Sequence, residues 1–234
     1  MKYDIMYKLF TFLIFVAQVS FAQSVQPIGT SNGLMTTAQM GRSYYEVPIE
    51  GSPYVNELFK KGTTIINGTH KNDGLMRYDA YHDVIEIKNE NGSVRALLRR
   101  ENIIADIDGT LYMVRNYKSM GQVKAGYFNP LNEGYTRLLI RPKKIFVQAE
   151  NPENGYDVYK PAKYLDVTEY YLQQGDQPAT AIKLNKKSVL KFLNDDTNDI
   201  KKYIKDKDLN MRSKEDIIKL LNYYNTLDKD TTML

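Results

Sequence analysis

Apolar and polar residues alternate along much of the chain, most clearly between residues 74 and 118. Within the stretch VIEIK, Ile85 and Ile87 share one side of a strand. Glu86 and Lys88 share the other side, which is typical of an antiparallel sheet with one packed face and one solvated face. Turn residues close each stretch, so we predict a meander of paired strands. Its strands are expected at Leu75–Tyr81, Val84–Lys88, Val94–Leu98, Ile103–Asp106 and Leu111–Tyr117.

Further extended stretches lie on both sides of this meander. No gap between them before residue 185 holds a convincing helix of ten or more residues. The sequence therefore lacks the alternation of strands and helices that a parallel sheet requires. The additional strands are expected at Tyr44–Ile49, Tyr54–Phe59, Thr63–Ile66, Val123–Phe128, Tyr135–Ile140, Lys144–Gln148, Tyr156–Tyr159, Val167–Leu172 and Ala179–Leu184.

The period of the apolar positions changes from 2 to about 3.6 at Asn185. Asp196 and Ser213 are expected N-caps in front of two of the helices that follow. We predict a mainly β, α+β fold, in which a curved antiparallel meander or partial barrel carries two or three C-terminal helices. The apolar stripes of these helices are Val189–Leu193, Ile200–Ile204 and Ile217–Tyr224.

The first 22 residues have the features of a secretory signal peptide. Lys2 and Lys8 precede an apolar run, Leu9–Val19, whose eleven residues are too few for a membrane-spanning helix of roughly 20. We expect cleavage after Ala22 and an exported protein, periplasmic or extracellular, that does not span a membrane; a retained anchor is the alternative. The predicted segments are 1–22 signal peptide, 23–52 mobile leader, 53–184 β body, 185–227 helical segment packed on that body, and 228–234 frayed tail.

Composition narrows the classes of function. The chain has no cysteine, which excludes disulfides, thiol nucleophiles and thiolate metal sites. Its formal net charge is only +4, which argues against a nucleic-acid partner. It has 19 tyrosines and no tryptophan. Tyrosine suits half-exposed strand faces, so these residues indicate either strand packing or a tyrosine-lined groove for a glycan or peptide.

The stretch Ile103–Leu111, IIADIDGTL, resembles the first motif of the haloacid-dehalogenase-like phosphatases. The resemblance implies that Asp106 is the nucleophile and Asp108 the general acid/base, with Mg²⁺ bound between them. Asp195 and Asp196 would then be the late metal-binding pair. In that superfamily the motif ends a parallel strand that a helix follows, whereas hairpins flank it here. We therefore interpret it as a strand and a turn, with a phosphohydrolase as the alternative.

The two histidines, His70 and His82, have the acidic neighbours Asp73, Asp79 and Asp83. A metal site built from these residues is conceivable, but their spacing matches no ligand pattern. No glycine-rich phosphate loop, dinucleotide fingerprint or nucleophile elbow occurs either. We therefore assign no metal ligand, no cofactor and no catalytic residue outside the Asp106–Asp108 alternative.

Two stretches resemble a group of small exported proteins of Bacteroidota that are mostly uncharacterised. One is GSPYVNELFKKGTTIING with GLMRYDAYHDVIEIK, and the other is KKYIKDKDLNMRSKEDIIKLLNYYNTL. The resemblance covers Gly51–Leu227 and implies a cell-envelope location with no catalytic residues to transfer. We therefore expect a non-enzymatic envelope protein that binds or scaffolds an envelope protein, lipid or glycan. By analogy of fold alone, a curved sheet with helices across one opening could hold an acyl chain or a lipoprotein segment, as periplasmic lipoprotein carriers do.

Overall fold

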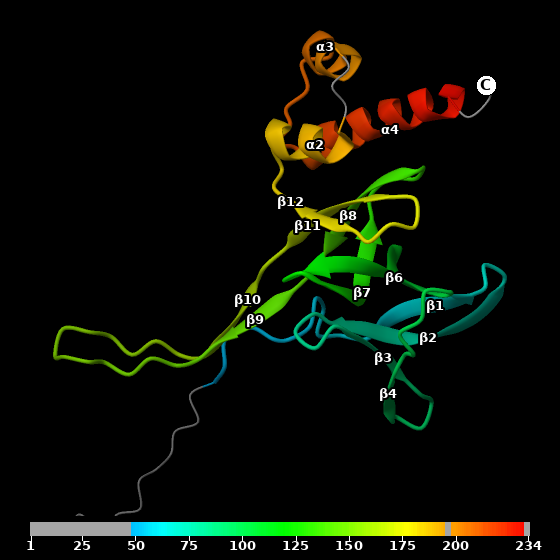
Figure 1. Ribbon diagram of the computed structural model, residues 1–234. Helices are drawn as coiled ribbons and strands as arrows, with labels where there is room; N and C mark the ends of the chain where they lie inside the picture. Colours follow the sequence, from blue (N-terminus) through cyan, green and yellow to red (C-terminus); the bar gives the residue numbers. More distant parts are fainter. Residues whose placement is uncertain (1–47, 195–197, 232–234) are drawn as a thin grey trace, which may run out of the picture. The chain divides into compact units, whose positions relative to one another are not determined.

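The structure is a computed structural model that describes residues 48–194 and 198–231 (Figure 1). The chain separates into two units, Met1–Tyr45 and Glu46–Leu234, and all described residues belong to the second. The expected signal peptide, most of the leader, and both Asp195 and Asp196 lie outside the described residues. So does most of the expected strand Tyr44–Ile49.

The described chain is mainly β, as the alternation predicts, and every pair of named strands is antiparallel. Ten strands form one sheet in the order β12-β11-β8-β7-β6-β5-β1-β2-β3-β4, and β9 pairs with β10 separately. The strands are β1 Lys60–Ile66, β2 His70–Asp79, β3 Val84–Lys88, β4 Val94–Ala96, β5 Ile103–Ile107, β6 Thr110–Ser119, β7 Gln122–Pro130, β8 Thr136–Arg141, β9 Lys144–Val147, β10 Lys163–Asp166, β11 Glu169–Gln174 and β12 Thr180–Ile182.

The meander differs from the prediction at one point, because β4 does not pair with β5. Strand β1 lies between β2 and β5, and its Ile65 is opposite both Lys71 and Ile104. The chain therefore leaves the sheet at its β4 edge and returns on the other side of the β1–β2 hairpin. Alternation within a strand cannot reveal this, because it specifies the faces of a strand and not its neighbours.

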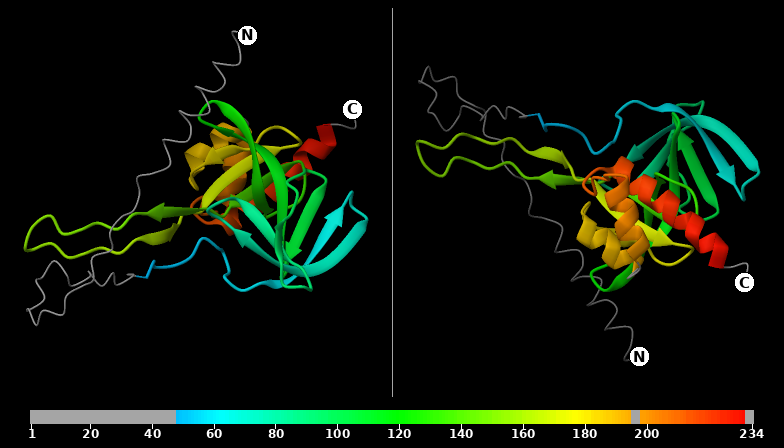
Figure 2. Two further views of the ribbon diagram at one scale, coloured as in Figure 1. Left: turned by 90° about the horizontal axis from the view of Figure 1, so that it is seen from below. Right: turned by 90° about the horizontal axis from the view of Figure 1, so that it is seen from above.

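The sheet is strongly curled, as predicted, so that the turn after β2 reaches β7 (Figure 2). Asp83 in this turn accepts a hydrogen bond from the backbone N–H of Tyr127 at 3.2 Å, although three strands, β1, β5 and β6, lie between β2 and β7 in the sheet. The concave side is filled by apolar and aromatic side chains. Its buried residues are Met76, Tyr78, Ala80, Ile85, Ala105, Ile107, Tyr112, Val114 and Tyr127.

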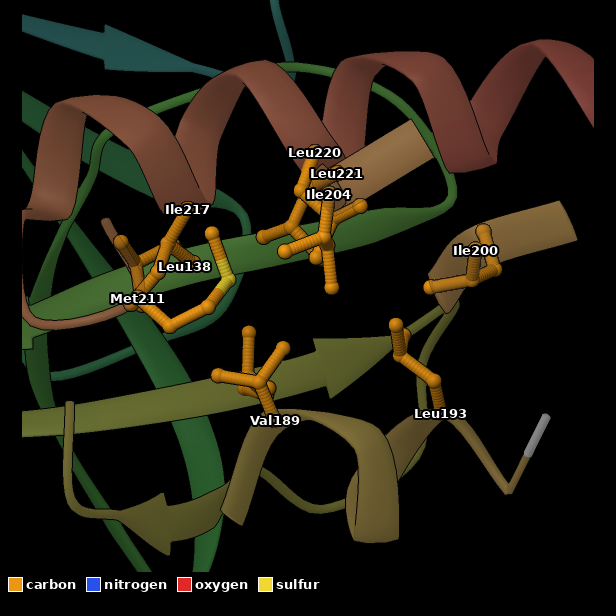
Figure 3. Packing of buried hydrophobic residues seen from close by; sticks show 10 residues of the cluster. Leu138, Val189, Leu193, Ile200, Ile204, Met211, Ile217, Leu220 and Leu221 are labelled. Atoms are coloured by element: carbon orange, nitrogen blue, oxygen red, sulfur yellow. The ribbon is translucent and has the colours of Figure 1, made fainter. Parts of the chain in front are cut away.

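Three helices follow the sheet: α2 Lys186–Leu193, α3 Asn198–Asp206 and α4 Lys214–Thr231. The side chain of Asn185 caps α2 by accepting from the N–H of Ser188 at 2.8 Å. The predicted apolar stripes face one another and the sheet, and α4 continues past Leu227 (Figure 3). They form a core from Leu138, Leu172, Val189, Leu193, Ile200, Ile204, Met211, Ile217, Leu220 and Leu221.

Two expected strands are not strands. In Tyr54–Phe59, only Tyr54 forms an isolated bridge, and the rings of Tyr54 and Phe59 lie 3.6 and 4.4 Å from the Arg77 guanidinium. These cation–π contacts and one backbone hydrogen bond, from the N–H of Val55 to the Tyr78 carbonyl at 3.0 Å, hold the segment on the sheet without a strand ladder. The expected strand Tyr156–Tyr159 belongs to the loop between β9 and β10, where it has no neighbouring strand to pair with.

The β9–β10 hairpin leads away from the ten-stranded sheet in every view (Figures 1 and 2). The short charged segment of β10 carries little alternation, so the sequence did not predict it. At the far end of the hairpin, Tyr156 and Val158 are 99% and 80% exposed. Within the described residues, no helix combines the length and apolar character that crossing a membrane requires.

Candidate functional site

Asp106 and Asp108 occupy a strand and its hairpin turn, as their sequence pattern predicts. Asp106 lies on β5 between Thr63 of β1 and Leu111 of β6. Asp108 and Gly109 have φ of +52° and +82°, which suits a two-residue hairpin turn. The Asp106 carboxylate accepts a hydrogen bond from the N–H of Gly109 at 2.9 Å and so stabilises the turn. The parallel sheet that a phosphatase of the resembled superfamily requires does not form around these residues.

The histidines and their acidic neighbours are dispersed. His70 is the first residue of β2 and His82 follows the end of this strand, so the two histidines lie at opposite ends of β2. The Nδ1 atom of His82 lies 2.8 Å from the carboxylate of Asp79, which also accepts from the N–H groups of Tyr81 and His82. Asp83 faces a different set of partners. Among the described residues, no three His, Asp or Glu side chains are arranged to hold a metal ion.

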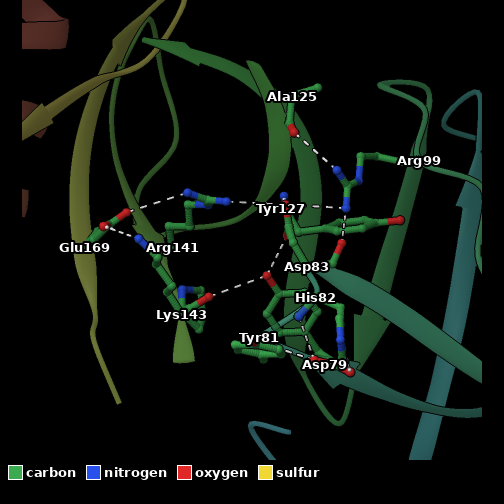
Figure 4. Close-up of polar contacts among 12 residues, drawn as sticks. Asp79, Tyr81, His82, Asp83, Arg99, Ala125, Tyr127, Arg141, Lys143 and Glu169 are labelled. Atoms are coloured by element: carbon green, nitrogen blue, oxygen red, sulfur yellow. Dashed lines mark hydrogen bonds and ion pairs between the residues drawn. The ribbon is translucent and has the colours of Figure 1, made fainter. Parts of the chain in front are cut away.

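Asp83 is the centre of a half-buried polar cluster that connects the two halves of the curled sheet (Figure 4). Its carboxylate accepts from the hydroxyl of Tyr78 at 2.7 Å and lies 3.5 Å from both Arg99 and Arg141. Burial, followed by the charge of Asp83, raises the pKa of the Tyr78 hydroxyl far above its ordinary value. Because these donors surround the carboxylate, it serves to hold the curl and is not free to act as a base.

Arg141 extends this cluster across the sheet to β11. Its guanidinium lies 3.6 Å from the carboxylate of Glu169 and 4.5 Å from the centre of the Tyr117 ring. Glu169 also accepts from Lys143 at 3.1 Å and from the Tyr171 hydroxyl at 3.0 Å. Each charge therefore has an opposite charge beside it, as a half-buried structural cluster requires.

Five of the tyrosines on the strands are buried, and they form two aromatic clusters. Tyr78, Tyr112 and Tyr127 meet on the concave side of the sheet, with ring centres 4.9 and 5.9 Å apart. Tyr117 and Tyr171 pack edge-to-face with Phe128 in a second cluster. This arrangement agrees with the strand-packing interpretation of the tyrosine content. The composition alone could not distinguish it from a tyrosine-lined groove.

An open cleft of about 830 Å³ lies over β1, β2 and β3 and is here called the sheet cleft. Gly62 and Gly74 are opposite each other on β1 and β2, and both line the cleft. A Cβ at Gly62 would meet the Asp106 carbonyl at 2.7 Å and the Met76 sulfur at 3.1 Å, so glycine is needed there for close packing. Cationic and anionic side chains alternate around the two glycines, and no aromatic residue lines the cleft. Its residues are Lys61, Gly62, Thr63, Asp73, Gly74, Leu75, Ile87, Lys88, Asn89, Glu90, Arg95, Asp106, Asp108 and Gly109.

A second pocket, of about 560 Å³, shares Asp73, Ile87 and Arg95 with the sheet cleft. It is more apolar, because Ile66, Met76, Leu97, Leu98 and Ile103 contribute to its lining. The two hollows therefore adjoin, and both lie beside β4, the last strand of the sheet.

Sequence reasoning found Asp106 and Asp108 for a different role but missed the other residues of the sheet cleft. Gly62 and Gly74 become neighbours only through the register of the β1–β2 hairpin. Asp106 reaches the same place from β5 because β5 lies beside β1 and not beside β4, its predecessor in the sequence. No local signal identifies such a set.

No protein-family model, no curated protein and no solved structure matches this chain. Function must therefore be inferred from the residues and the geometry described above.

Proposed function

We propose that this is an exported, non-enzymatic protein of the cell envelope that binds an extended polypeptide segment of an envelope partner in the sheet cleft. The proposed location rests on the signal-peptide features of residues 1–22 and on the resemblance to exported proteins. The binding role rests on the cleft. Its volume of about 830 Å³ is within the range of about 300–1,000 Å³ typical of ligand sites.

An extended polypeptide fits the lining better than a glycan does. Glycan sites favour aromatic platforms, and the sheet cleft has none. Gly74 allows another backbone to approach, because it has no side chain and only Ile87 and Met76 lie near its missing Cβ, at 3.7 and 3.8 Å. The alternating charges of Lys88, Arg95 and Asp73 suit polar side chains of a peptide, and the adjoining pocket suits an apolar one.

The free edge of the sheet supports the same proposal. Strand β4 pairs only with β3, and its other edge has no neighbouring strand in the described residues. An exposed edge of this kind accepts an added strand through backbone hydrogen bonds, while pockets beside it select side chains. Arg95 is on this strand and lines both hollows. A bound polypeptide segment would therefore contact the free edge of β4 and the sheet cleft at the same time.

The alternative is a secreted Mg²⁺-dependent phosphohydrolase that uses Asp106 and Asp108. The observation in its favour is that both carboxylates line the sheet cleft. Against it, the Asp106 carboxylate already accepts from Gly109, and no three His, Asp or Glu side chains among the described residues are arranged to hold a metal ion. We prefer the binding role for these reasons.

Binding is tested by selecting peptides from a phage-displayed library on the immobilised protein and measuring their affinity by fluorescence anisotropy. Gly74→Phe should fill the cleft without unfolding the chain, since a Cβ there meets only Ile87 and Met76, at 3.7 and 3.8 Å. We expect it to weaken binding at least about tenfold, the effect of about 1.4 kcal/mol. Gly155→Phe, in open space on the β9–β10 loop, is the matched control and should bind like the parent.

Equal binding by Gly74→Phe and the parent, or a library that yields no binding peptide, would contradict the proposed role. Export is tested separately by mass spectrometry of the protein recovered from an envelope fraction. We expect an N-terminus at Gln23, and an intact Met1 on such protein would exclude signal cleavage.

A further inference from the structure

A second open cleft, of about 620 Å³, lies where α2 begins and where α3 connects to α4. We call it the helical cleft. Its charged residues are all basic: Lys186 and Lys187 from the start of α2, and Arg212 from the segment before α4. It shares no residue with the sheet cleft. The remaining lining residues are Asn185, Ile204, Leu209, Asn210 and Met211.

The three basic groups are not neutralised by the part of the chain that the structure describes. None of Lys186, Lys187 and Arg212 forms an ion pair with a described residue. Three cations that converge on one hollow raise its local potential, and this attracts an anion. If these basic residues only formed a solvent-exposed helix face, they would not need to surround a cleft.

Nearby acidic groups are engaged elsewhere. The carboxylate of Asp216 accepts from the N–H of Asn210 at 3.0 Å and lies 2.8 Å from the Lys219 ammonium. Glu215 accepts from the hydroxyl of Ser213 at 2.7 Å. Asp206 and Asp208 precede this segment, but neither lines the helical cleft. The lining therefore keeps its positive character.

The floor of the helical cleft is apolar. Ile204 and Met211 are only 6% and 5% exposed and belong to the core between the helices and the sheet. Leu209 packs against the same core and is partly exposed. A hollow with a basic rim and an apolar floor matches a ligand with an anionic head and an apolar body. A free inorganic anion or a nucleic acid would leave the exposed part of Leu209 uncovered.

We propose that the helical cleft binds a single anionic phospholipid. The phosphate lies among Lys186, Lys187 and Arg212, and the glycerol and upper acyl carbons lie on Ile204, Leu209 and Met211. Charge-assisted hydrogen bonds from ammonium and guanidinium groups suit phosphate oxygens. This site does not depend on the proposed polypeptide binding, because the two clefts share no residue.

The test is co-sedimentation with vesicles of phosphatidylcholine, with and without phosphatidylglycerol. The parent protein should bind only the vesicles that contain phosphatidylglycerol. The triple variant Lys186→Gln, Lys187→Gln, Arg212→Gln should lose roughly 100-fold in affinity, given the usual contribution of three basic residues at an anionic surface. All three side chains are exposed, so the variant should melt like the parent.

The matched control removes the same charge from the same helices away from the cleft, with Lys191→Gln, Lys201→Gln and Lys202→Gln. These residues are exposed and do not line the helical cleft. We expect less than a tenfold loss from this control. An equal loss in both triple variants would mean that general attraction to the basic helices explains vesicle binding, and the site would be rejected.

A soluble short-chain phosphatidylglycerol separates the lipid from its head group. Isothermal titration should show that it binds at least tenfold more tightly than glycerol 3-phosphate or inorganic phosphate, because only the lipid covers the apolar floor. If inorganic phosphate binds as tightly as the short-chain lipid, the cleft is a site for free phosphate and the lipid assignment is wrong.

Discussion

The side-chain amide of Asn225 pairs with both backbone groups of Thr136. Its Oδ1 accepts from the Thr136 N–H at 2.8 Å, and its Nδ2 donates to the Thr136 carbonyl at 3.0 Å. Asn132 continues this pattern by accepting from the N–H of Leu138 at 2.7 Å. Strand β7 pairs with β8 only near Ile140, so these two amides satisfy the β8 groups that β7 leaves free.

We therefore expect Asn225→Leu to destabilise the fold by roughly 2–3 kcal/mol, because the fully buried Thr136 N–H loses its acceptor. The measurement is urea denaturation followed by circular dichroism. Thr226→Leu, on an exposed position of the same helix, is the control and should change stability by less than about 0.5 kcal/mol. Similar losses in the two variants would show that the amide pair has no special role.

The docking of α4 is tested by Leu221→Asp. Leu221 is fully buried in the core shared by the helices and the sheet. An aspartate there loses packing and leaves an unpaired buried charge, so at least ~3 kcal/mol of stability should be lost. Asn222→Asp adds the same charge one residue away on the exposed side and should melt close to the parent. A Leu221→Asp protein that melts within a degree or two of the parent would contradict this docking.

Two tyrosines on the concave side should respond in opposite ways to loss of the hydroxyl. Tyr78 donates to the Asp83 carboxylate, so Tyr78→Phe should cost about 1.5–3 kcal/mol, as hydrogen bonds to charged groups do. The Tyr127 hydroxyl is buried without a hydrogen-bond partner. Tyr127→Phe should therefore leave stability unchanged or raise it by about 1 kcal/mol. The free energy of unfolding of both variants is measured by denaturant titration. Equal losses of stability would mean that the Tyr127 hydroxyl also has a hydrogen-bond partner.

Alkaline pH should unfold the protein through these buried phenols. Burial raises the pKa of both Tyr112 and Tyr127 to about 12, above the ordinary value of about 10 in the unfolded chain. The folded state then holds protons that the unfolded state releases, so their contribution to stability is complete below about pH 10 and is lost as pH rises through about 12. Denaturation midpoints measured at increasing pH should fall more gently in Tyr112→Phe. An unchanged slope would show that Tyr112 does not take part.

The turn after β5 gives a test of backbone strain. Gly109 has φ of +82° and open space around its missing Cβ, so Gly109→Val should cost on the order of 1–2 kcal/mol from backbone conformation alone. Gly155 also has open space but no positive φ, which makes Gly155→Val the matched control. In thermal melts, Gly109→Val should unfold at a lower temperature than Gly155→Val, because only the valine at residue 109 is strained.

The same turn decides between binding and phosphoryl chemistry. Asp106→Asn keeps the oxygen that accepts from Gly109, so the fold should be preserved. The parent and this variant should both fail to hydrolyse a generic aryl phosphate in the presence of Mg²⁺. Turnover by the parent that disappears in Asp106→Asn would establish Asp106 as a nucleophile and overturn the binding proposal.

The sequence alone determined the local structure of this protein. Alternation at Val84–Lys88, the Asp108-Gly109 turn and the stripe through Ile217 and Leu221 are short-range patterns, so each predicts its element without knowledge of the rest. The antiparallel class, the curled sheet and the three helices follow from them. The segments that failed, such as Tyr54–Phe59, depend on long-range contacts with Arg77.

The tertiary structure alone decided which elements are neighbours, and with them the candidate sites. Period-2 alternation specifies the two faces of a strand, but it contains no information about which strand lies beside it. Strand pairing places β1 between β2 and β5 and puts Gly62 opposite Gly74. The curl of the sheet brings Asp83 within hydrogen-bonding distance of the Tyr127 N–H. Because such pairing is set by the burial of the whole sheet, the clefts and the buried tyrosines emerge only in the folded chain.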